Sequence, residues 1–281
     1  MVTNLNKRKI FVTGAGGYIG KYLVNELLKS NCQVFALVHG QHSLSANIKN
    51  PRLMIVRGDI NEPKSYKKYL DNSDIIIHLA ASLRQFEKND ELNNTNIVGL
   101  KRLLEQCVFP KRKISFIFFS SIDAVKRQSD YARSKYEGEK IVIEFCANNP
   151  DVKPYIVRVG NVFDNEGKGM LPWVINIVNK RNWQSSVLYH VLGSKKIYLI
   201  ERSSLIKQII KLIKYLPNRR LLTLVDEEIT VHDLIKKLKE KKRIVSYPKK
   251  LLLGNLYLKL WQRLGNILKK SDLIIYLSLE K

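Results

Sequence analysis

The sequence predicts an α/β protein built on a doubly wound parallel sheet, with a smaller second region. Short apolar runs alternate with segments of helical periodicity over the first 160 residues. A glycine-rich turn joins the first of these runs to the first helical segment. Strands that alternate with helices form parallel sheets, and such sheets bind ligands at the carboxyl ends of their strands.

Each expected element follows from its residue pattern. Apolar runs of strand length predict strands at Lys9–Thr13, Gln33–Val38, Leu53–Arg57, Ile75–Leu79, Ile114–Ser120 and Tyr155–Val159. Apolar residues at helical spacing predict helices at Tyr18–Lys29, Leu92–Cys107 and Tyr131–Cys146. The alternation then loosens, so we expect a dinucleotide-binding domain over residues 1–162 and a smaller substrate-binding region over residues 163–281.

The composition argues against several classes of protein. Apolar runs such as Ile75–Ala81 are far shorter than the roughly 20 residues that cross a bilayer, so no transmembrane helix is expected. The first nine residues are polar and basic and lack the pattern of a signal peptide, which predicts a cytoplasmic protein. Cys32, Cys107 and Cys146 are widely spaced without a C-x-x-C pair, so neither a disulfide framework nor a metal site is expected.

The formal charge of +24 is the one unusual feature of the composition. Such a charge attracts anions, including nucleotide phosphates, nucleic acids and acidic membranes. The densest basic run, residues 236–243, lacks the interleaved aromatic residues of a surface that binds nucleic acid. We therefore expect a solvated lysine-rich face there, and no nucleic-acid partner.

The turn after the first strand has the spacing G-x-x-G-x-x-G at Gly14, Gly17 and Gly20. Glycines in this position let the chain turn tightly, let backbone N–H groups approach a pyrophosphate and let the helix pack closely on the strand. The amino end of the following helix favours the negative charge of the phosphates. The turn therefore predicts a Rossmann-type site for a dinucleotide.

The residues near the adenosine ribose favour NADP over NAD. No acidic residue occurs between Leu27 and Gly58, although NAD-binding sites of this type carry one near the end of the second strand. His39 ends that strand, and we expect it to face a 2′-phosphate. Asp59 follows the third strand, where its carboxylate either binds the adenine amino group or caps the next turn.

A tyrosine and a lysine four residues apart suggest the chemistry. Tyr131 and Lys135 lie on one face of the expected helix, and a nearby ammonium lets a tyrosine act as an acid or base near neutral pH. Tyr136 and Lys140 have the same spacing but point about 140° away around the helix. Only one of the two pairs can face a cofactor.

These motifs together resemble the extended short-chain dehydrogenase/reductases, specifically the NAD-dependent epimerase/dehydratase family that contains UDP-galactose 4-epimerase. The resemblance is carried by Thr13–Gly20, Asp59-Ile60, His78-Leu79-Ala80-Ala81, Asn96–Gly99, Ser120-Ser121, Tyr131–Lys135 with Glu139, and Arg158–Asn161. The Y-x-x-S-K form of the tyrosine motif selects Tyr131 over Tyr136. Three of the matched residues each have an alternative interpretation without a function. His78 could be a core histidine, Asn96 a polar residue on a helix face and Asn161 a turn former.

The resemblance implies a role for each matched residue. It implies Ser121, Tyr131 and Lys135 as catalytic residues. It implies that the cofactor contacts Gly14, Gly16, Gly17, Tyr18, Ile19, Gly20, His39, Asp59, Ile60, Leu79, Ala80, Ala81, Asn96, Tyr131 and Lys135. It implies that the substrate contacts Ser82, Ser121, Asn161 and Lys196.

The resemblance implies hydride transfer at C4 of a nucleotide sugar, with UDP as the expected nucleotide, in the synthesis of surface polysaccharide precursors. Epimerisation is the first interpretation, and an NADPH-dependent 4-keto reductase is the alternative. A dehydratase ranks third, because the segment after Ser121 offers only Asp123 as a carboxylate. A non-catalytic dinucleotide-binding scaffold is the rival from another class, and the resemblance allows a homodimer.

Overall fold

The computed structural model describes residues 5, 7–40, 44, 50–82, 89–109, 112–164, 170–179, 189–190 and 192–240. They form two compact units. Among the described residues, the first unit contains those up to Val159 together with Leu205–Leu224, and the second contains the rest. The predicted boundary at residue 162 puts residues 205–224 in the second region, whereas their strand joins the sheet of the first unit.

The first unit is built on a seven-stranded sheet in the order β3-β2-β1-β4-β5-β6-β9, in which all neighbouring strands are parallel. The strands are β1 (Lys9–Thr13), β2 (Gln33–Val38), β3 (Leu53–Arg57), β4 (Ile75–His78), β5 (Ile114–Ser121), β6 (Val152–Val159) and β9 (Leu221–Leu224). The chain order reverses between β1 and β4, and ligands of doubly wound sheets bind at this reversal. The predicted Rossmann-type fold is confirmed.

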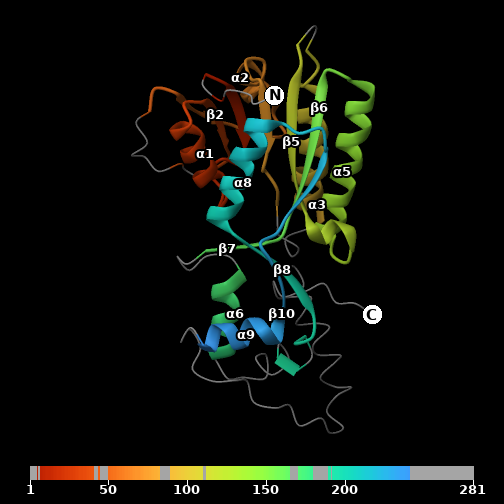
Figure 1. Ribbon diagram of the computed structural model, residues 1–281. Coiled ribbons are helices and arrows are strands. Elements are labelled where there is room, and N and C mark those ends of the chain that lie inside the picture. Colours follow the sequence, from red (N-terminus) through yellow and green to blue (C-terminus); the bar gives the residue numbers. More distant parts are fainter. Residues whose placement is uncertain are drawn as a thin grey trace. The chain divides into compact units, whose positions relative to one another are not determined.

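Helices connect these strands (Figure 1). They are α1 (Gly20–Lys29), α2 (Lys67–Leu70), α3 (Asn89–Asn93), the π-helix η2 (Asn94–Val98), α4 (Gly99–Glu105), α5 (Asp130–Asn148) and α8 (Arg202–Tyr215), with the 3₁₀ turns η1 (Pro63–Ser65) and η3 (Ile122–Val125). Helix α1 packs against β1 and β2, and α5 packs against β5, β6 and α4. The predicted helix at Leu92–Cys107 is therefore three consecutive helical pieces.

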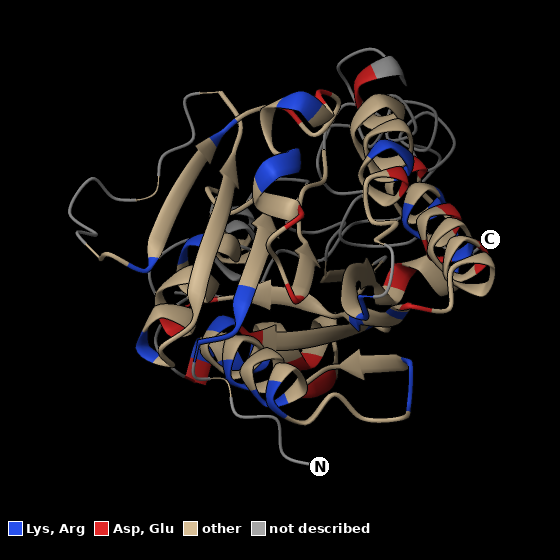
Figure 2. Cartoon of the chain, turned by 90° about the horizontal axis from the view of Figure 1, so that it is seen from above, with Lys and Arg blue, Asp and Glu red and all other residues tan. Residues whose placement is uncertain are grey.

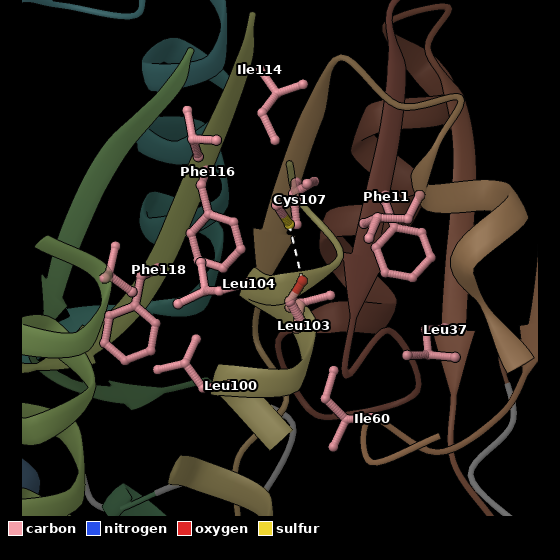
Figure 3. Close-up of a cluster of buried hydrophobic side chains, with 14 of the residues drawn as sticks. Phe11, Leu37, Ile60, Leu100, Leu103, Leu104, Cys107, Ile114, Phe116 and Phe118 are labelled. Atoms are coloured by element: carbon pink, nitrogen blue, oxygen red, sulfur yellow. Dashed lines mark hydrogen bonds between the residues drawn. The ribbon is translucent and has the colours of Figure 1, made fainter. Parts of the chain in front are cut away.

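The core of the first unit lies between the sheet and the helices α2, α4 and α5 (Figure 3). Phe11, Phe116 and Phe118 project from the central strands into this core and are buried. Cys107 is also buried there, and its Sγ donates a hydrogen bond to the Leu103 carbonyl at 3.1 Å. Burial raises the pKa of the Cys107 thiol, so this cysteine is a packing residue.

The second unit has a small sheet in the order β10-β8-β7. Its elements are β7 (Asn161–Phe163), α6 (Met170–Asn179), β8 (Lys196–Glu201), β10 (Glu227–Thr230) and α9 (Val231–Glu240). Strand β10 runs antiparallel to β8, and β7 runs parallel to it. Apolar side chains of α6 and α9 form the core with those of the sheet. None of the helices in the described ranges is long and apolar enough to span a bilayer.

Candidate active site

The glycine loop between β1 and α1 is packed so closely that two of its positions have no room for a side chain. Gly14 has a φ of +64°, and a Cβ on it would lie 2.7 Å from the backbone nitrogen of Ala80, just after β4. A Cβ on Gly20 would collide with the Gly14 carbonyl oxygen and lie 2.8 Å from the Cα of Ala15. The Gly17 N–H donates to the Gly14 carbonyl at 3.0 Å and closes the turn. The loop is therefore held tightly against the carboxyl end of β4.

The amino end of α1 is suited to an anionic group. Ile19 occupies the N-cap position, and no described side chain caps the helix there. The first turn of the helix also contains no acidic residue. Backbone N–H groups at an uncapped helix start favour phosphate oxygens. Together with the loop's lack of side chains, this arrangement fits the pyrophosphate of a dinucleotide, with Gly16, Gly17 and Tyr18 in the same loop.

His39 and Asp59 lie together beyond the ends of β2 and β3. The His39 Nε2 is 3.4 Å from the Asp59 Oδ2, and the other carboxylate oxygen of Asp59 accepts the Asn61 N–H at 2.8 Å. Asp59 thus has the turn-capping contact that the sequence left as one of two alternatives. Ile60, expected near the cofactor, lies in the hydrophobic core against Gly99 (Figure 3).

Thr13 joins the ends of β1 and β4 through its side chain. Its Oγ1 accepts the Ala80 N–H at 3.1 Å and lies 2.9 Å from the His78 Nδ1. His78 is 1% exposed, and burial, with the nearby Lys135 charge, lowers its pKa to about 3. His78 is therefore a neutral core histidine that orients Thr13. Leu79, Ala80, Ala81 and Ser82 follow β4 and are half-buried.

Asn96 fixes the chain after β4 to α5. It is buried in the π-helix, where its Oδ1 accepts the Ser82 N–H at 2.8 Å. Its Nδ2 donates to the Ser82 carbonyl at 3.1 Å and to the Ser134 Oγ at 2.9 Å. Both amide protons are thus used within the protein. Ser134 was not among the predicted site residues, although the Y-x-x-S-K motif contained the signal for it.

Lys135 is the buried cation of the site. It is 4% exposed, and its Nζ donates to the Phe119 carbonyl of β5 at 2.8 Å. The same Nζ lies 5.7 Å from the centre of the Tyr131 ring and 5.1 Å from that of Phe118. Burial lowers the pKa of Lys135 to about 8, while the Glu139 carboxylate opposes this shift. The structure therefore brings Tyr131 and Lys135 together at the end of β5.

The competing pair has a different environment. The Arg127 guanidinium lies 4.4 Å from the centre of the Tyr136 ring. The Lys140 side chain is exposed, and its Nζ forms an ion pair with Glu137 at 2.7 Å. A solvated, ion-paired ammonium on the surface stabilises a phenolate less than a buried one does. The geometry favours Tyr131 for the chemistry.

Ser121, the last residue of β5, forms two hydrogen bonds with Asp123. Its Oγ accepts the Asp123 N–H at 3.2 Å and donates to the Asp123 Oδ2 at 3.4 Å. Burial raises the pKa of Asp123, while the Ser121 hydrogen bond and then the Lys126 charge lower it. In the sequence Asp123 stands out only as the single carboxylate where a dehydratase has an acidic pair, and its contact with Ser121 was not predicted. Asp123 orients the Ser121 hydroxyl.

Glu139 ties α5 to both β5 and β6. Its carboxylate is buried, accepts the Ser120 Oγ–H at 2.5 Å, and binds the Arg158 guanidinium at 2.9 and 2.6 Å. This two-pronged contact matches the planar fork of an arginine. Glu139 lies one helical turn beyond Lys135, so the contact fixes the register of α5 against the strands.

Two of the predicted substrate residues belong to the second unit. The Asn161 Nδ2 donates to the Tyr198 carbonyl at 3.3 Å, within the small sheet. Lys196 is exposed and forms an ion pair with Glu228 at 2.6 Å. Both side chains thus have a partner within their own unit, and their contact with a substrate stays a prediction.

A family model decides the relationship of the chain. Residues 10–196, more than half of the chain, match the model described as the NAD dependent epimerase/dehydratase family. The chain belongs to this family. The match covers the glycine loop, the serine strand and the Tyr-Lys helix, so membership confirms the resemblance that the motifs indicated.

Solved structures of the family have the same fold at low sequence identity. WbmF from Bordetella bronchiseptica in complex with NAD⁺ is 17% identical with a TM-score of 0.72, covering 91% of this chain and 84% of WbmF. UDP-glucose 4-epimerase from Thermotoga maritima with UDP-glucose is 18% identical with a TM-score of 0.69, covering 88% and 86%. At these identities, the similarity to the two structures shows only that they share the fold of this chain.

Curated relatives include oxidoreductases and a subunit of a larger complex. From Dictyostelium discoideum, the mitochondrial NADH dehydrogenase [ubiquinone] 1 alpha subcomplex subunit 9 is 29% identical over 58% of this chain. The sterol-4-alpha-carboxylate 3-dehydrogenase, decarboxylating, of the same organism is 24% identical over 63% of this chain. The matches span 44% and 60% of these two relatives' own length.

Proposed function

We propose that the chain is an NAD(P)-dependent enzyme that epimerises a nucleotide-linked sugar through hydride transfer at C4. The observation that carries this proposal is the buried Lys135 ammonium, held by the Phe119 carbonyl beside the Tyr131 ring. An ammonium in this place favours the phenolate of Tyr131, which then takes a proton from a sugar hydroxyl. The UDP-sugars named with the structural neighbours support this substrate class.

The nicotinamide ring of the bound cofactor supplies the hydride acceptor and donor. The glycine loop and the uncapped start of α1 hold the pyrophosphate. Tyr131 moves the proton of the reacting hydroxyl, and Lys135 keeps Tyr131 ionisable. Ser121 holds the reacting oxygen by a hydrogen bond, in an orientation set by Asp123.

NADP is the cofactor that we propose on the basis of His39. Neither β2 nor His39 after it carries a carboxylate, and the His39 ring, which lies 3.4 Å from the Asp59 Oδ2, supplies a hydrogen-bond donor for a 2′-phosphate. Titration calorimetry with both dinucleotides tests this. His39→Ala should weaken NADP binding and leave NAD binding within about twofold, because only NADP places a phosphate there; equal losses for both dinucleotides contradict the proposal.

A reductase is the second candidate, and the names of the curated relatives favour it. One is a dihydroflavonol 4-reductase from Arabidopsis thaliana, 28% identical over 50% of this chain. A reductase needs the same Ser121, Tyr131 and Lys135. A non-catalytic scaffold is the third candidate, supported by the relative named as a complex subunit, but it gives no reason for a buried ammonium beside Tyr131.

The deciding experiment incubates the purified chain with a panel of UDP-sugars and either cofactor, and follows the products by NMR. Tyr131→Phe is the control. Interconversion of epimeric sugars supports the epimerase, provided that denaturing the freshly purified chain also releases the dinucleotide cofactor in near-stoichiometric amount. Consumption of NADPH that depends on a 4-keto sugar supports the reductase instead. Cofactor binding without turnover of any sugar supports the non-catalytic scaffold.

A further inference from the structure

Helix α8 has a basic outer face. Its buried side is apolar and consists of Leu205, Ile206, Ile209, Leu212 and Ile213. Its exposed side carries Lys207, Lys211 and Lys214, which follow one another at spacings of four and three residues. Such spacings place side chains in one row along a helix. The row faces away from the core of the first unit.

Acidic residues are missing from this row. The sequence from Arg202 to Val225 contains six basic residues and no acidic one. On other helices some exposed lysines are paired with an acidic residue, as in Lys29 with Glu26 and Lys140 with Glu137. Figure 2 shows the basic residues of the chain in blue and the acidic residues in red. Lys207 and Lys211 form no ion pair in the part of the chain that the structure describes. Their charge is therefore not neutralised within the described chain.

Two arginines follow the end of α8 in the chain. Arg219 is held by a hydrogen bond from its Nε to the Leu221 carbonyl at 2.9 Å, and the Arg220 guanidinium lies 5.4 Å from the centre of the Tyr155 ring. Both arginines are exposed. Tyr215 and Leu221 are 44% and 39% exposed. The α8–β9 surface, as we name residues 207–221, thus combines fixed cations with an exposed tyrosine and leucine.

We propose that the α8–β9 surface binds the anionic headgroups of a lipid membrane. Lysine and arginine attract acidic lipids, with their charged ends among the headgroups. Tyrosine and leucine at the edge of a basic row suit the boundary between headgroups and acyl chains. The chain would therefore lie on a membrane surface during its reaction, without spanning the bilayer.

The occupant is a membrane rather than a nucleic acid for two reasons. A surface that binds single strands presents several aromatic rings for successive bases, whereas this one exposes Tyr215 alone among its described residues. The sequence after residue 248, outside the described part, has a composition typical of segments that bind membrane interfaces: Trp261 and two tyrosines stand among leucines and isoleucines, and six basic residues occur from Lys249 to Lys270 inclusive.

The test uses the full chain and co-sedimentation with vesicles of phosphatidylcholine, with and without phosphatidylglycerol. We expect binding only where phosphatidylglycerol is present. Raising the salt from about 0.1 M to about 1 M shortens the Debye length from about 10 to about 3 Å and should release the protein. Binding to both vesicle types alike, or binding that salt does not weaken, overturns the proposal.

Matched variants assign the binding to the α8–β9 surface. Each lysine near an acidic surface strengthens binding about fivefold, so Lys207→Gln with Lys211→Gln should weaken vesicle binding about 30-fold. The control, Lys101→Gln with Lys153→Gln, removes the same charge from exposed positions on α4 and β6 and should change binding less than threefold or so. Equal losses of vesicle binding in the two double variants would mean that net charge alone causes the binding, and this result would overturn the assignment to the α8–β9 surface. A DNA duplex that competes the protein off the vesicles at equal phosphate concentration assigns the surface to nucleic acid instead.

Discussion

Replacing Glu139 by methionine should destabilise the first unit by about 3 kcal/mol. The change leaves the Arg158 guanidinium without its carboxylate and the Ser120 hydroxyl without its acceptor. Removing one partner of a buried ion pair costs about 3 to 5 kcal/mol. The Arg158 side chain is 21% exposed and can turn towards water, so we expect the lower end of this range.

Urea unfolding followed by circular dichroism measures this loss, and a double variant tests its cause. In Glu139→Met with Arg158→Met no charge is left unpaired, so stability should return to within about 1 kcal/mol of the natural chain. The double-mutant cycle then gives a coupling energy of at least about 2 kcal/mol. A double variant as unstable as the sum of the two single ones would refute the reasoning, because the loss would then come from packing.

Three further outcomes follow from the site. Tyr131→Phe should lower turnover by about 10² to 10⁴, the usual loss of a general acid–base group, whereas Tyr136→Phe should leave turnover within about twofold in the same assay; the reverse result would move the active face of α5. Gly14→Ala should weaken dinucleotide binding in calorimetry far more than Gly40→Ala, because both glycines have positive φ but only the Cβ at Gly14 meets backbone atoms. The pKa of Lys135 falls from 10.5 to about 8 on burial, so the charged lysine opposes folding most strongly below pH 8 and less as the pH rises towards 10.5. Lys135→Met should therefore unfold at a higher urea concentration than the natural chain at pH 7, with the difference shrinking by pH 10; a constant difference would mean that the charge is not its cause.

The sequence predicted the first half of the fold well, because its strands are continuous apolar runs between polar turns. Strands β1, β2 and β3 have the predicted bounds, and β6 begins three residues earlier than expected, at Val152. Strands β7, β9 and β10 have only three or four residues each, too few for a recognisable pattern. Helix α8 was missed although its buried residues show clear helical spacing, from Leu205 to Ile213.

Residue types in the site were predictable, but their contacts were not. The Y-x-x-S-K motif indicated Tyr131 and Lys135, and the structure brings them together. Asp59 and Asn96 use hydrogen-bonding atoms within the protein, which depends on where distant turns lie in space. The motif assigned Ile60 to the cofactor; its apolar side chain packs in the core, and its contact with a cofactor stays a prediction.

Residues 205–224 belong to the first unit, although residues 160–204 of the second unit precede them in the chain. This order affects how the first unit folds during synthesis. Strand β6 ends at Val159, but its outer neighbour β9 comes about 65 residues later in the chain. A ribosome adding about 5 to 20 residues per second needs about 3 to 13 seconds for this stretch. Throughout that interval the N–H and C=O groups on one side of β6 have no β9 to pair with, so the nascent chain exposes an open sheet edge to its neighbours. A fragment that stops before Leu221 keeps this open edge permanently, whereas a fragment that includes β9 also includes residues 160–204 of the second unit, so the first unit cannot be isolated by shortening the chain from its carboxyl end.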